Sequence, residues 1–158
     1  MGHRSVVITV SDGVSAGVRE DGSGEALEAL LSGSGFEVSR DLVPDEADDI
    51  VDAIRRACAT SDLVVTTGGT GFGLRDVTPE ATGRILEREA PGLVQAMIAR
   101  GLEATPMAAL TRAKAGTIGN SLVINLPGSP KGAVENLEAV LDVLAHALQL
   151  LSGDNLHH

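Results

Sequence analysis

Residues 62–82, with the sequence DLVVTTGGTGFGLRDVTPEAT, constrain the fold of this chain more than any other stretch. The apolar run at 63–65 lies between polar residues, and it is short enough for a buried strand but too short for a helix. Glycines follow at positions 68, 69, 71 and 73. Thr78 is a favoured helix N-cap, and Pro79 suits the first helical position. The stretch therefore predicts a strand, a glycine loop and a helix, with Arg75 and Asp76 in the loop.

A loop of this kind can turn its backbone N–H groups toward a phosphate. It does not match the better-known phosphate-binding loops, however. A dinucleotide fingerprint needs a third glycine where this chain has Leu74, and a P-loop needs a lysine that is absent here. The alternative interpretation, a flexible turn that binds nothing, remains open at this point.

Composition excludes several classes of function. Acidic residues outnumber Lys and Arg by 22 to 12, which gives a net charge of −10 and disfavours binding to nucleic acid. A phosphate ligand would therefore need backbone N–H groups, helix N-termini, local cations or a divalent metal. The chain has no Trp or Tyr and only two Phe, so we expect an aliphatic core. A single cysteine, Cys58, is predicted to be buried and inert. No run is long enough to span a membrane, and we expect a cytoplasmic protein.

The remaining pattern predicts an α/β fold, a three-layer α/β/α arrangement around a mostly parallel, mixed sheet, in a single domain over residues 1–158. We expect strands at 6–10 and at 36–43, the latter near the sheet edge, and an antiparallel hairpin at 115–126 around Gly119-Asn120. Helices are expected to begin near Ser23 and to span 46–59, 78–87 and 91–101. A final helix is capped by Ser129. His157 and His158 are interpreted as a frayed end or part of a purification tag.

The loops at 11–22, 67–78 and 127–132, together with the turn at Asp45, are predicted to converge at the carboxyl ends of the strands. Each candidate residue has a structural alternative. Asp12 could belong to a turn, Asp45 is favoured by its spacing as a helix N-cap, and Asp76 could pair with Arg75. Lys131 could face a phosphate or only solvent. Because metal-ligating His and Cys clusters and a serine nucleophile motif are absent, phosphoryl or nucleotidyl transfer with Mg²⁺ remains.

Three motifs carry a resemblance to a known family. TTGGTG (66–71) followed by RDVTPEAT (75–82), then LPGSPKG (126–132), and a PDE turn (44–46) are similar to motifs of the MoaB/Mog family of molybdenum-cofactor biosynthesis, which includes the gephyrin G domain. The resemblance covers essentially the whole chain. It implies a MogA/MoaB-like fold and the transfer of AMP from Mg²⁺-ATP to the terminal phosphate of molybdopterin. The alternative is a member that binds molybdopterin or acts as a scaffold without catalysis.

The resemblance also implies roles for individual residues. Asp45 and Asp76 would be catalytic, with Asp76 a ligand of Mg²⁺. The expected substrate-binding residues are Ser11, Asp12, Thr67, Gly68, Gly69, Thr70, Gly71, Arg75, Pro127, Gly128 and Ser129.

Family members form trimers, so a homotrimer is expected, as is delivery of the product to a molybdenum-insertion protein. The expected trimer interface lies within 91–113, where the apolar residues are Leu93, Met97, Leu102, Met107 and Leu110.

Overall fold

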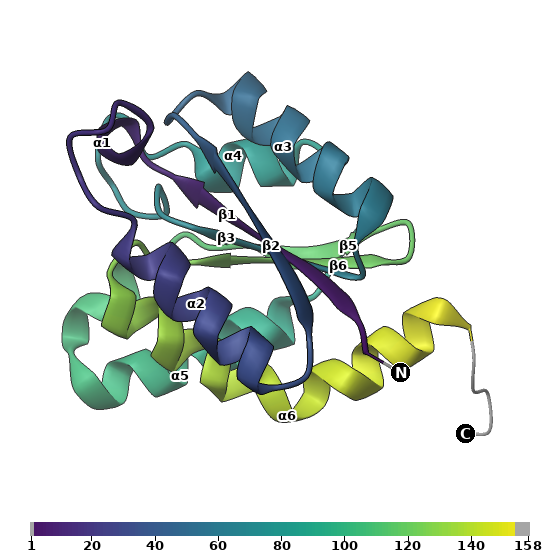
Figure 1. The fold of residues 1–158 in the computed structure, drawn as a ribbon. Helices are drawn as coiled ribbons and strands as arrows, with labels where there is room; N and C mark the ends of the chain where they lie inside the picture. Colours follow the sequence, from purple (N-terminus) through teal and green to yellow (C-terminus); the bar gives the residue numbers. More distant parts are fainter. Residues whose placement is uncertain (1, 154–158) are drawn as a thin grey trace.

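The computed structural model describes residues 2–153, so His157 and His158 lie outside the described residues. Figure 1 shows helices on both sides of a twisted sheet. The elements in chain order are β1 (Arg4–Val10), α1 (Asp12–Ser15), α2 (Gly22–Gly33), β2 (Glu37–Val43), α3 (Ala47–Thr60), β3 (Leu63–Thr67), α4 (Thr78–Gly83), β4 (Arg88–Glu89), α5 (Pro91–Ala104), the 3₁₀ helix η1 (Pro106–Leu110), β5 (Ala115–Ile118), β6 (Ser121–Leu126) and α6 (Pro130–Ser152).

Within residues 2–153 the strands form one sheet in the order β2-β1-β3-β6-β5-β4. The first four of these run parallel, whereas β5 pairs antiparallel with β6 and β4 pairs antiparallel with β5. The predicted mixed, mostly parallel sheet is therefore confirmed, as are the edge position of β2 and the hairpin at 115–126. Gly119 supplies the positive φ, +57°, that the tight turn between β5 and β6 requires.

The predicted continuation of the helix to residue 87 is wrong, because α4 ends at Gly83. Beyond it the backbone bonds to the sheet instead: Glu87 N–H donates to the Thr117 carbonyl at 2.8 Å, and Ala90 N–H donates to the Ala115 carbonyl at 2.8 Å. These bonds place the two-residue strand β4 beside β5. The short helix α1 was also not predicted.

The sheet separates two clusters of buried apolar side chains. Helices α2, α5 and α6 cover one face, where Val7, Val65 and Ile124 point, and α3 and α4 cover the other (Figure 1). Successive residues of a strand point to opposite faces, so β1, β3 and β6 are buried on both sides. The buried hydrophobic residues described are aliphatic or Met, as the composition predicts.

Two apolar predictions are resolved by burial. Met97 is buried in the core, so its side chain is not available for the trimer interface expected from the sequence, and Leu93 is partly buried against the same core. Leu102, Met107 and Leu110 are exposed.

Cys58 is half-buried in α3, and burial raises the pKa of its thiol, which disfavours the reactive thiolate. None of the helices described between residues 2 and 153 is both long and apolar enough to cross a membrane.

The order of the strands creates a crevice at the carboxyl ends of the central strands. Strands β1 and β3 are neighbours, but the helix that follows β1 (α2) packs on one face and the helix that follows β3 (α4) packs on the other. Open α/β sheets bind ligands at such a switch point, outside the carboxyl ends of the strands.

Candidate active site

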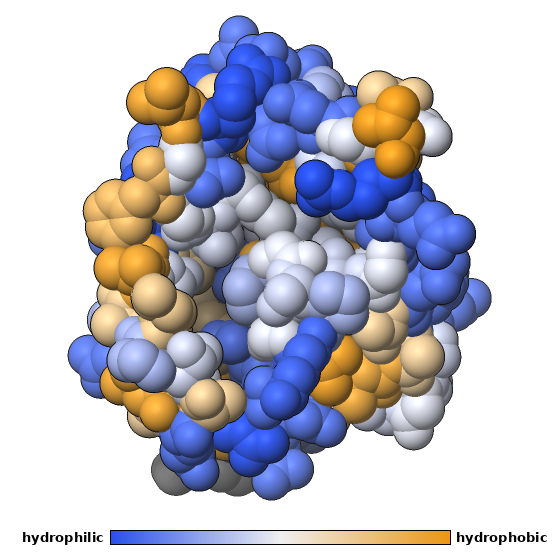
Figure 2. Space-filling model, turned by 90° about the vertical axis from the view of Figure 1, so that its left-hand side faces the viewer, coloured by the Kyte–Doolittle hydropathy of each residue, from blue (hydrophilic) through white to orange (hydrophobic). Residues whose placement is uncertain are grey.

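A cleft of about 730 Å³ opens at the carboxyl ends of β1, β3 and β6. Figure 2 faces this edge of the sheet: pale and blue surface dominates its centre, and orange surface gathers toward its margins. The predicted loops do converge here. Of the predicted site residues, those that line the cleft are Ser11, Asp45, Thr67, Gly68, Gly69, Asp76, Gly128 and Ser129.

The other predicted residues lie beside the cleft. Thr70, Gly71 and Pro127 line a smaller pocket of about 190 Å³ next to η1. Asp12 and Arg75 pair with each other outside the cleft lining. Lys131 does not line the cleft either, although Ser129 caps α6 as predicted by accepting a hydrogen bond from Gly132 N–H.

The glycine loop has its shape because two positions tolerate no side chain. Gly68 and Gly69 have φ of +105° and +70°, in the region that favours glycine. A Cβ at Gly68 would collide with the Val10 carbonyl oxygen, and a Cβ at Gly69 would collide with the Thr78 hydroxyl. The Gly68 N–H already donates to the Leu126 carbonyl at 3.1 Å. Gly68 therefore gives the cleft an open backbone surface rather than a free donor.

Thr78 does not cap α4, and that prediction is wrong: Val77 occupies the N-cap position. The Thr78 hydroxyl instead donates to the Gly68 carbonyl at 2.9 Å, and the Thr78 N–H donates to the Gly69 carbonyl at 3.1 Å. The start of α4 is thereby bonded to the glycine loop, so this residue fixes the loop rather than the helix.

Asp76 is held within the loop and faces the cleft. Its Oδ2 accepts a hydrogen bond from Gly73 N–H at 2.9 Å. Its neighbour Arg75 pairs elsewhere, so the alternative in which Asp76 is neutralised by Arg75 is excluded. Asp76 can form this turn and still bind a ligand in the cleft, because a carboxylate can accept several hydrogen bonds and the Gly73 N–H uses only one of these positions.

Asp45 is not the N-cap of α3, contrary to the prediction from its spacing. Glu46 occupies that position and makes no side-chain capping bond. Instead Asp45 Oδ2 accepts from Asp12 N–H at 2.9 Å, and Asp12 Oδ1 accepts from Asp45 N–H at 3.0 Å. Burial raises the pKa of the Asp45 carboxyl, and the negative charges of Asp12 and Asp76 act in the same direction. The two candidate catalytic carboxyls are thus close enough to interact.

Arg75 joins the glycine loop to the two loops beside it. Its Nε and Nη2 donate to the two oxygens of Asp12 at 3.0 and 3.1 Å, and Nη2 also donates to Glu46 at 3.0 Å. These bonds hold the pKa of the Asp12 carboxyl below its usual range, and the Asp45 N–H contributes to the same effect. Arg75 therefore organises the loops. Within residues 2–153 it forms ion pairs with Asp12 and Glu46 but not with Asp45 or Asp76, although its charge also favours ionisation of Asp45.

Sequence reasoning missed Arg112, which bonds to the glycine loop but does not itself line the cleft. Its Nε donates to the Gly71 carbonyl at 2.7 Å and its Nη2 donates to the Asp76 carbonyl at 2.8 Å, while Nη1 pairs with Glu80. Its guanidinium also lies 5.7 Å from the centroid of the Phe72 ring. The interacting residues lie 32 to 41 positions away along the chain, so no local signal could have identified this arginine.

Residues 19–22, which line the cleft, belong to the loop at 11–22 that was predicted to converge here, although none of them was singled out, and Thr9 and Ser23 line the cleft without having been predicted to do so. In the described part of the chain, no group of three or more His, Cys, Asp or Glu side chains could hold a metal ion. Asp45 and Asp76 do fit Mg²⁺ in its common mode, in which one or two carboxylates bind the ion and waters and substrate phosphates complete its coordination.

Comparison with known proteins gives a consistent result. A family described as "probable molybdopterin binding domain" matches residues 6–146. A molybdopterin adenylyltransferase of Helicobacter pylori is 42% identical, covering 94% of this chain and 87% of that protein. The Escherichia coli enzyme of the same name is 39% identical, covering 93% and 84%. A crystal structure of the molybdopterin biosynthesis enzyme MoaB from Thermus thermophilus is 50% identical and superposes with a TM-score of 0.90, covering 96% of this chain and 98% of that one.

Proposed function

Because this chain belongs to the family of molybdopterin binding domains, we propose that it is a molybdopterin adenylyltransferase, as its relatives are named. It is a nucleotidyltransferase of molybdenum cofactor biosynthesis. In its reaction an oxygen of the terminal phosphate of molybdopterin bonds to the α-phosphorus of ATP. The bond from that phosphorus to the β-phosphate oxygen breaks, so AMP is transferred and pyrophosphate leaves.

One observation carries the assignment of the site: Asp45 and Asp76 converge on a backbone surface that has no side chains. An ideal Cβ placed on Gly69 would lie 3.2 Å from Asp45 Oδ1, so this carboxyl lies directly against the glycine loop. Asp76 reaches the same cleft from the other end of the loop. Phosphates can approach such a backbone closely, and the two carboxylates lack a paired cation in the described residues.

The residues of the cleft have different proposed roles. The glycine loop and the residues around Gly128 and Ser129 bind and orient the phosphates. Asp45 and Asp76 lie where Mg²⁺ would bind, with Asp76 as the proposed ligand of the ion. When bound, Mg²⁺ supplies positive charge that offsets the charge accumulating on the departing pyrophosphate. Catalysis then rests on positioning and charge stabilisation, which is how phosphoryl transfer is generally accelerated.

The test is incubation of the protein with ATP, Mg²⁺ and molybdopterin, followed by chromatography of the pterin and a coupled assay for pyrophosphate. We expect adenylylated molybdopterin and pyrophosphate in equal amounts. Binding of molybdopterin without either product would instead support the non-catalytic, scaffold interpretation. Omission of Mg²⁺ should abolish both products, and activity that survives chelation would contradict the metal assignment.

We propose a homotrimer in which exposed apolar side chains of α5 and η1 meet another subunit. Leu102, Met107 and Leu110 are between 47% and 67% exposed, and Met107 and Leu110 line the same pocket next to η1, so their apolar surface can contact another subunit. Acidic subunits repel one another, so association should strengthen with moderate salt. Light scattering at low and moderate salt tests this, and a monomer at micromolar concentration in both would contradict it. A cytoplasmic location and delivery of the product to a molybdenum-insertion protein belong to the same proposal.

A further inference from the structure

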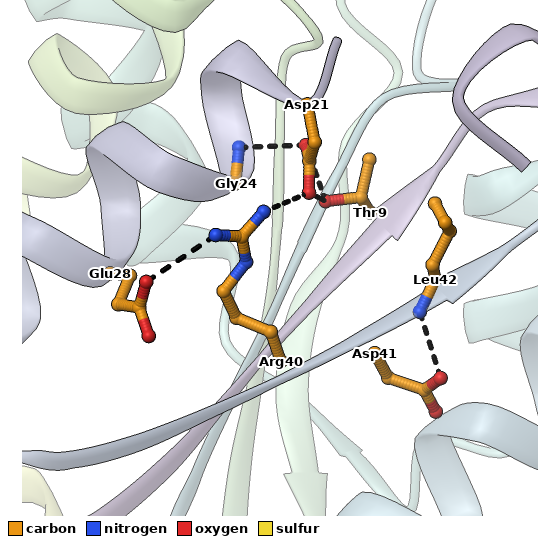
Figure 3. Close-up of polar contacts among 7 residues, drawn as sticks. All are labelled: Thr9, Asp21, Gly24, Glu28, Arg40, Asp41 and Leu42. Atoms are coloured by element: carbon orange, nitrogen blue, oxygen red, sulfur yellow. Dashed lines mark hydrogen bonds and ion pairs between the residues drawn. The ribbon is translucent and has the colours of Figure 1, made fainter. Parts of the chain in front are cut away.

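A second charged cluster lies at the start of α2, and Figure 3 shows its contacts. Asp21 caps the helix by accepting from Gly24 N–H at 3.0 Å, and the Thr9 hydroxyl on β1 lies 2.9 Å from both of its carboxylate oxygens. From β2, Arg40 Nη2 donates to Asp21 Oδ2, and Arg40 Nη1 donates to Glu28 at 3.3 Å. The side chain of Asp21 is only 15% exposed and that of Arg40 only 29%.

Asp21 forms a wall between two depressions. On one side it lines the large cleft together with Thr9, and on the other side it lines a depression next to Arg40. Arg40 itself does not reach the cleft lining. Arg40 therefore contacts Asp21 from the side away from the cleft, whereas the opposite side of Asp21 faces the candidate active site.

The charges around the cleft explain why this pair matters. The acids that line it are Glu20, Asp21, Asp45 and Asp76, whereas Arg19 is the basic residue that lines it within the described chain. The proposed substrates, ATP and molybdopterin, carry phosphates and are anionic. A further uncompensated carboxylate in the wall would repel them, and its partial burial would limit screening by solvent and salt.

We propose that Arg40 is a positioning residue for substrate binding, which neutralises Asp21 from behind so that the wall of the cleft accepts a polyphosphate. The inference rests on the proposed function, because it requires an anionic ligand in this cleft. Arg40 touches no substrate in this scheme. Its effect is transmitted by the charge of Asp21, which remains the N-cap of α2 and bonds to β1.

The experiment uses two substitutions singly and together, Arg40→Gln and Asp21→Asn. Asparagine is as good an N-cap as aspartate, and its amide can still bond to the Thr9 hydroxyl, so Asp21→Asn removes charge while keeping the local structure. The dissociation constant of Mg²⁺-ATP is measured by isothermal titration calorimetry at low and moderate ionic strength. KM for ATP and kcat are measured with molybdopterin as the acceptor.

We expect Arg40→Gln to raise the dissociation constant and KM by about tenfold at low salt, with kcat within about twofold of the unsubstituted protein. The double variant should return both constants to within about threefold, because removing the second charge removes the repulsion. Arg40→Lys keeps the positive charge beside Asp21 but loses the second guanidinium nitrogen, which bonds to Glu28. This variant should therefore bind ATP nearly as well as the unsubstituted protein, and it replaces Arg40→Gln in the comparison if that variant does not fold.

Arg56→Gln is the matched control. Arg56, in α3, pairs at 3.2 Å with Asp41, which lies in β2 next to Arg40. Arg56→Gln therefore changes the net charge by the same amount as Arg40→Gln, but at a pair that does not line the cleft. It should leave ATP binding unchanged.

The inference is overturned if Arg40→Gln leaves ATP binding at the control value, or if the double variant binds ATP as weakly as Arg40→Gln. Either result would make Arg40 a structural residue or a direct ligand contact. Failure of the proposed function is distinct: the unsubstituted protein would then bind ATP without adenylylating molybdopterin, and the calorimetric comparison would still decide the inference. If the unsubstituted protein binds no ATP at all, both fall.

Discussion

Replacing Arg112 with methionine should impair catalysis more than folding, because this side chain holds the loop that carries Asp76. Methionine fills a similar volume but removes the bonds to the Gly71 and Asp76 carbonyls and the pair with Glu80. The backbone bond from Arg112 N–H to the Thr70 carbonyl, at 2.9 Å, does not depend on the side chain and should remain. The perturbation therefore loosens one side of the glycine loop without removing the segment that packs against it.

The magnitude follows from the individual contacts. A bond from a charged donor to a buried carbonyl contributes about 1.5–3 kcal/mol, and the half-buried carbonyls here belong at the lower end of that range. The Glu80 side chain is 56% exposed, so the ion pair adds little, and the ring of Phe72 adds about 0.5 kcal/mol. With about 1.5 kcal/mol for each of the two carbonyl bonds, the sum is roughly 3.5 kcal/mol. If all of it favours the competent loop conformation, kcat/KM should fall by roughly 400-fold.

The assay is steady-state adenylylation with thermal unfolding measured in parallel. Arg112→Lys keeps the charge and can reach one carbonyl, so its activity should be intermediate. Arg84→Met is the control, since Arg84 pairs with Asp48, whose side chain is 87% exposed, and its loss should be nearly neutral. If Arg112→Met unfolds at a lower temperature but keeps kcat/KM within about twofold of that control, the loop is ordered without Arg112 and the reasoning fails.

Three further predictions concern other residues. Asp76→Asn should abolish adenylylation with little change in melting temperature, because an amide oxygen still accepts the Gly73 N–H; a parallel loss of stability would show a structural role instead. Asp45→Asn should slow turnover but raise the melting temperature at neutral pH, because a carboxyl whose pKa is raised by burial destabilises the folded protein once it ionises. The gain in melting temperature should vanish below pH 3.8, the ordinary pKa, where the carboxyl is protonated in both the folded and the unfolded protein. A gain that persists at that pH would contradict the assignment. Asn125→Ala should lower the free energy of unfolding in urea by roughly 3–4 kcal/mol, because this fully buried amide bonds to Thr66, Thr82 and the Lys114 N–H; a loss below about 1 kcal/mol would contradict that account.

The fold could be predicted from the sequence because its signals are local. The apolar run of β3, the glycines after it, the turn at Gly119 and the cap at Ser129 each depend on residues within a few positions of one another. The same local reasoning was wrong for Asp45 and Thr78, which resemble N-caps by spacing. Their side chains instead bond to residues 33 and 10 positions away, partners that no local spacing reveals.

The candidate site was predictable as a set of converging loops but not as a set of contacts. A parallel sheet brings the ends of its central strands together, so Ser11, Gly68 and Gly128 had to lie near one another. The cations that organise the site are another matter. Arg40, Arg75 and Arg112 reach their acceptors from different elements, and which acid each one meets depends on the finished packing.

The aliphatic core has a practical consequence for work with this protein. With no Trp or Tyr anywhere in the chain, the protein is almost transparent in the near ultraviolet and has almost no intrinsic fluorescence. A pterin or an adenine nucleotide in the cleft would supply nearly the whole optical signal of the complex. Ligand binding can therefore be followed through the ligand's own absorbance and emission against a dark background, whereas protein concentration has to be determined from the peptide bond or by amino-acid analysis.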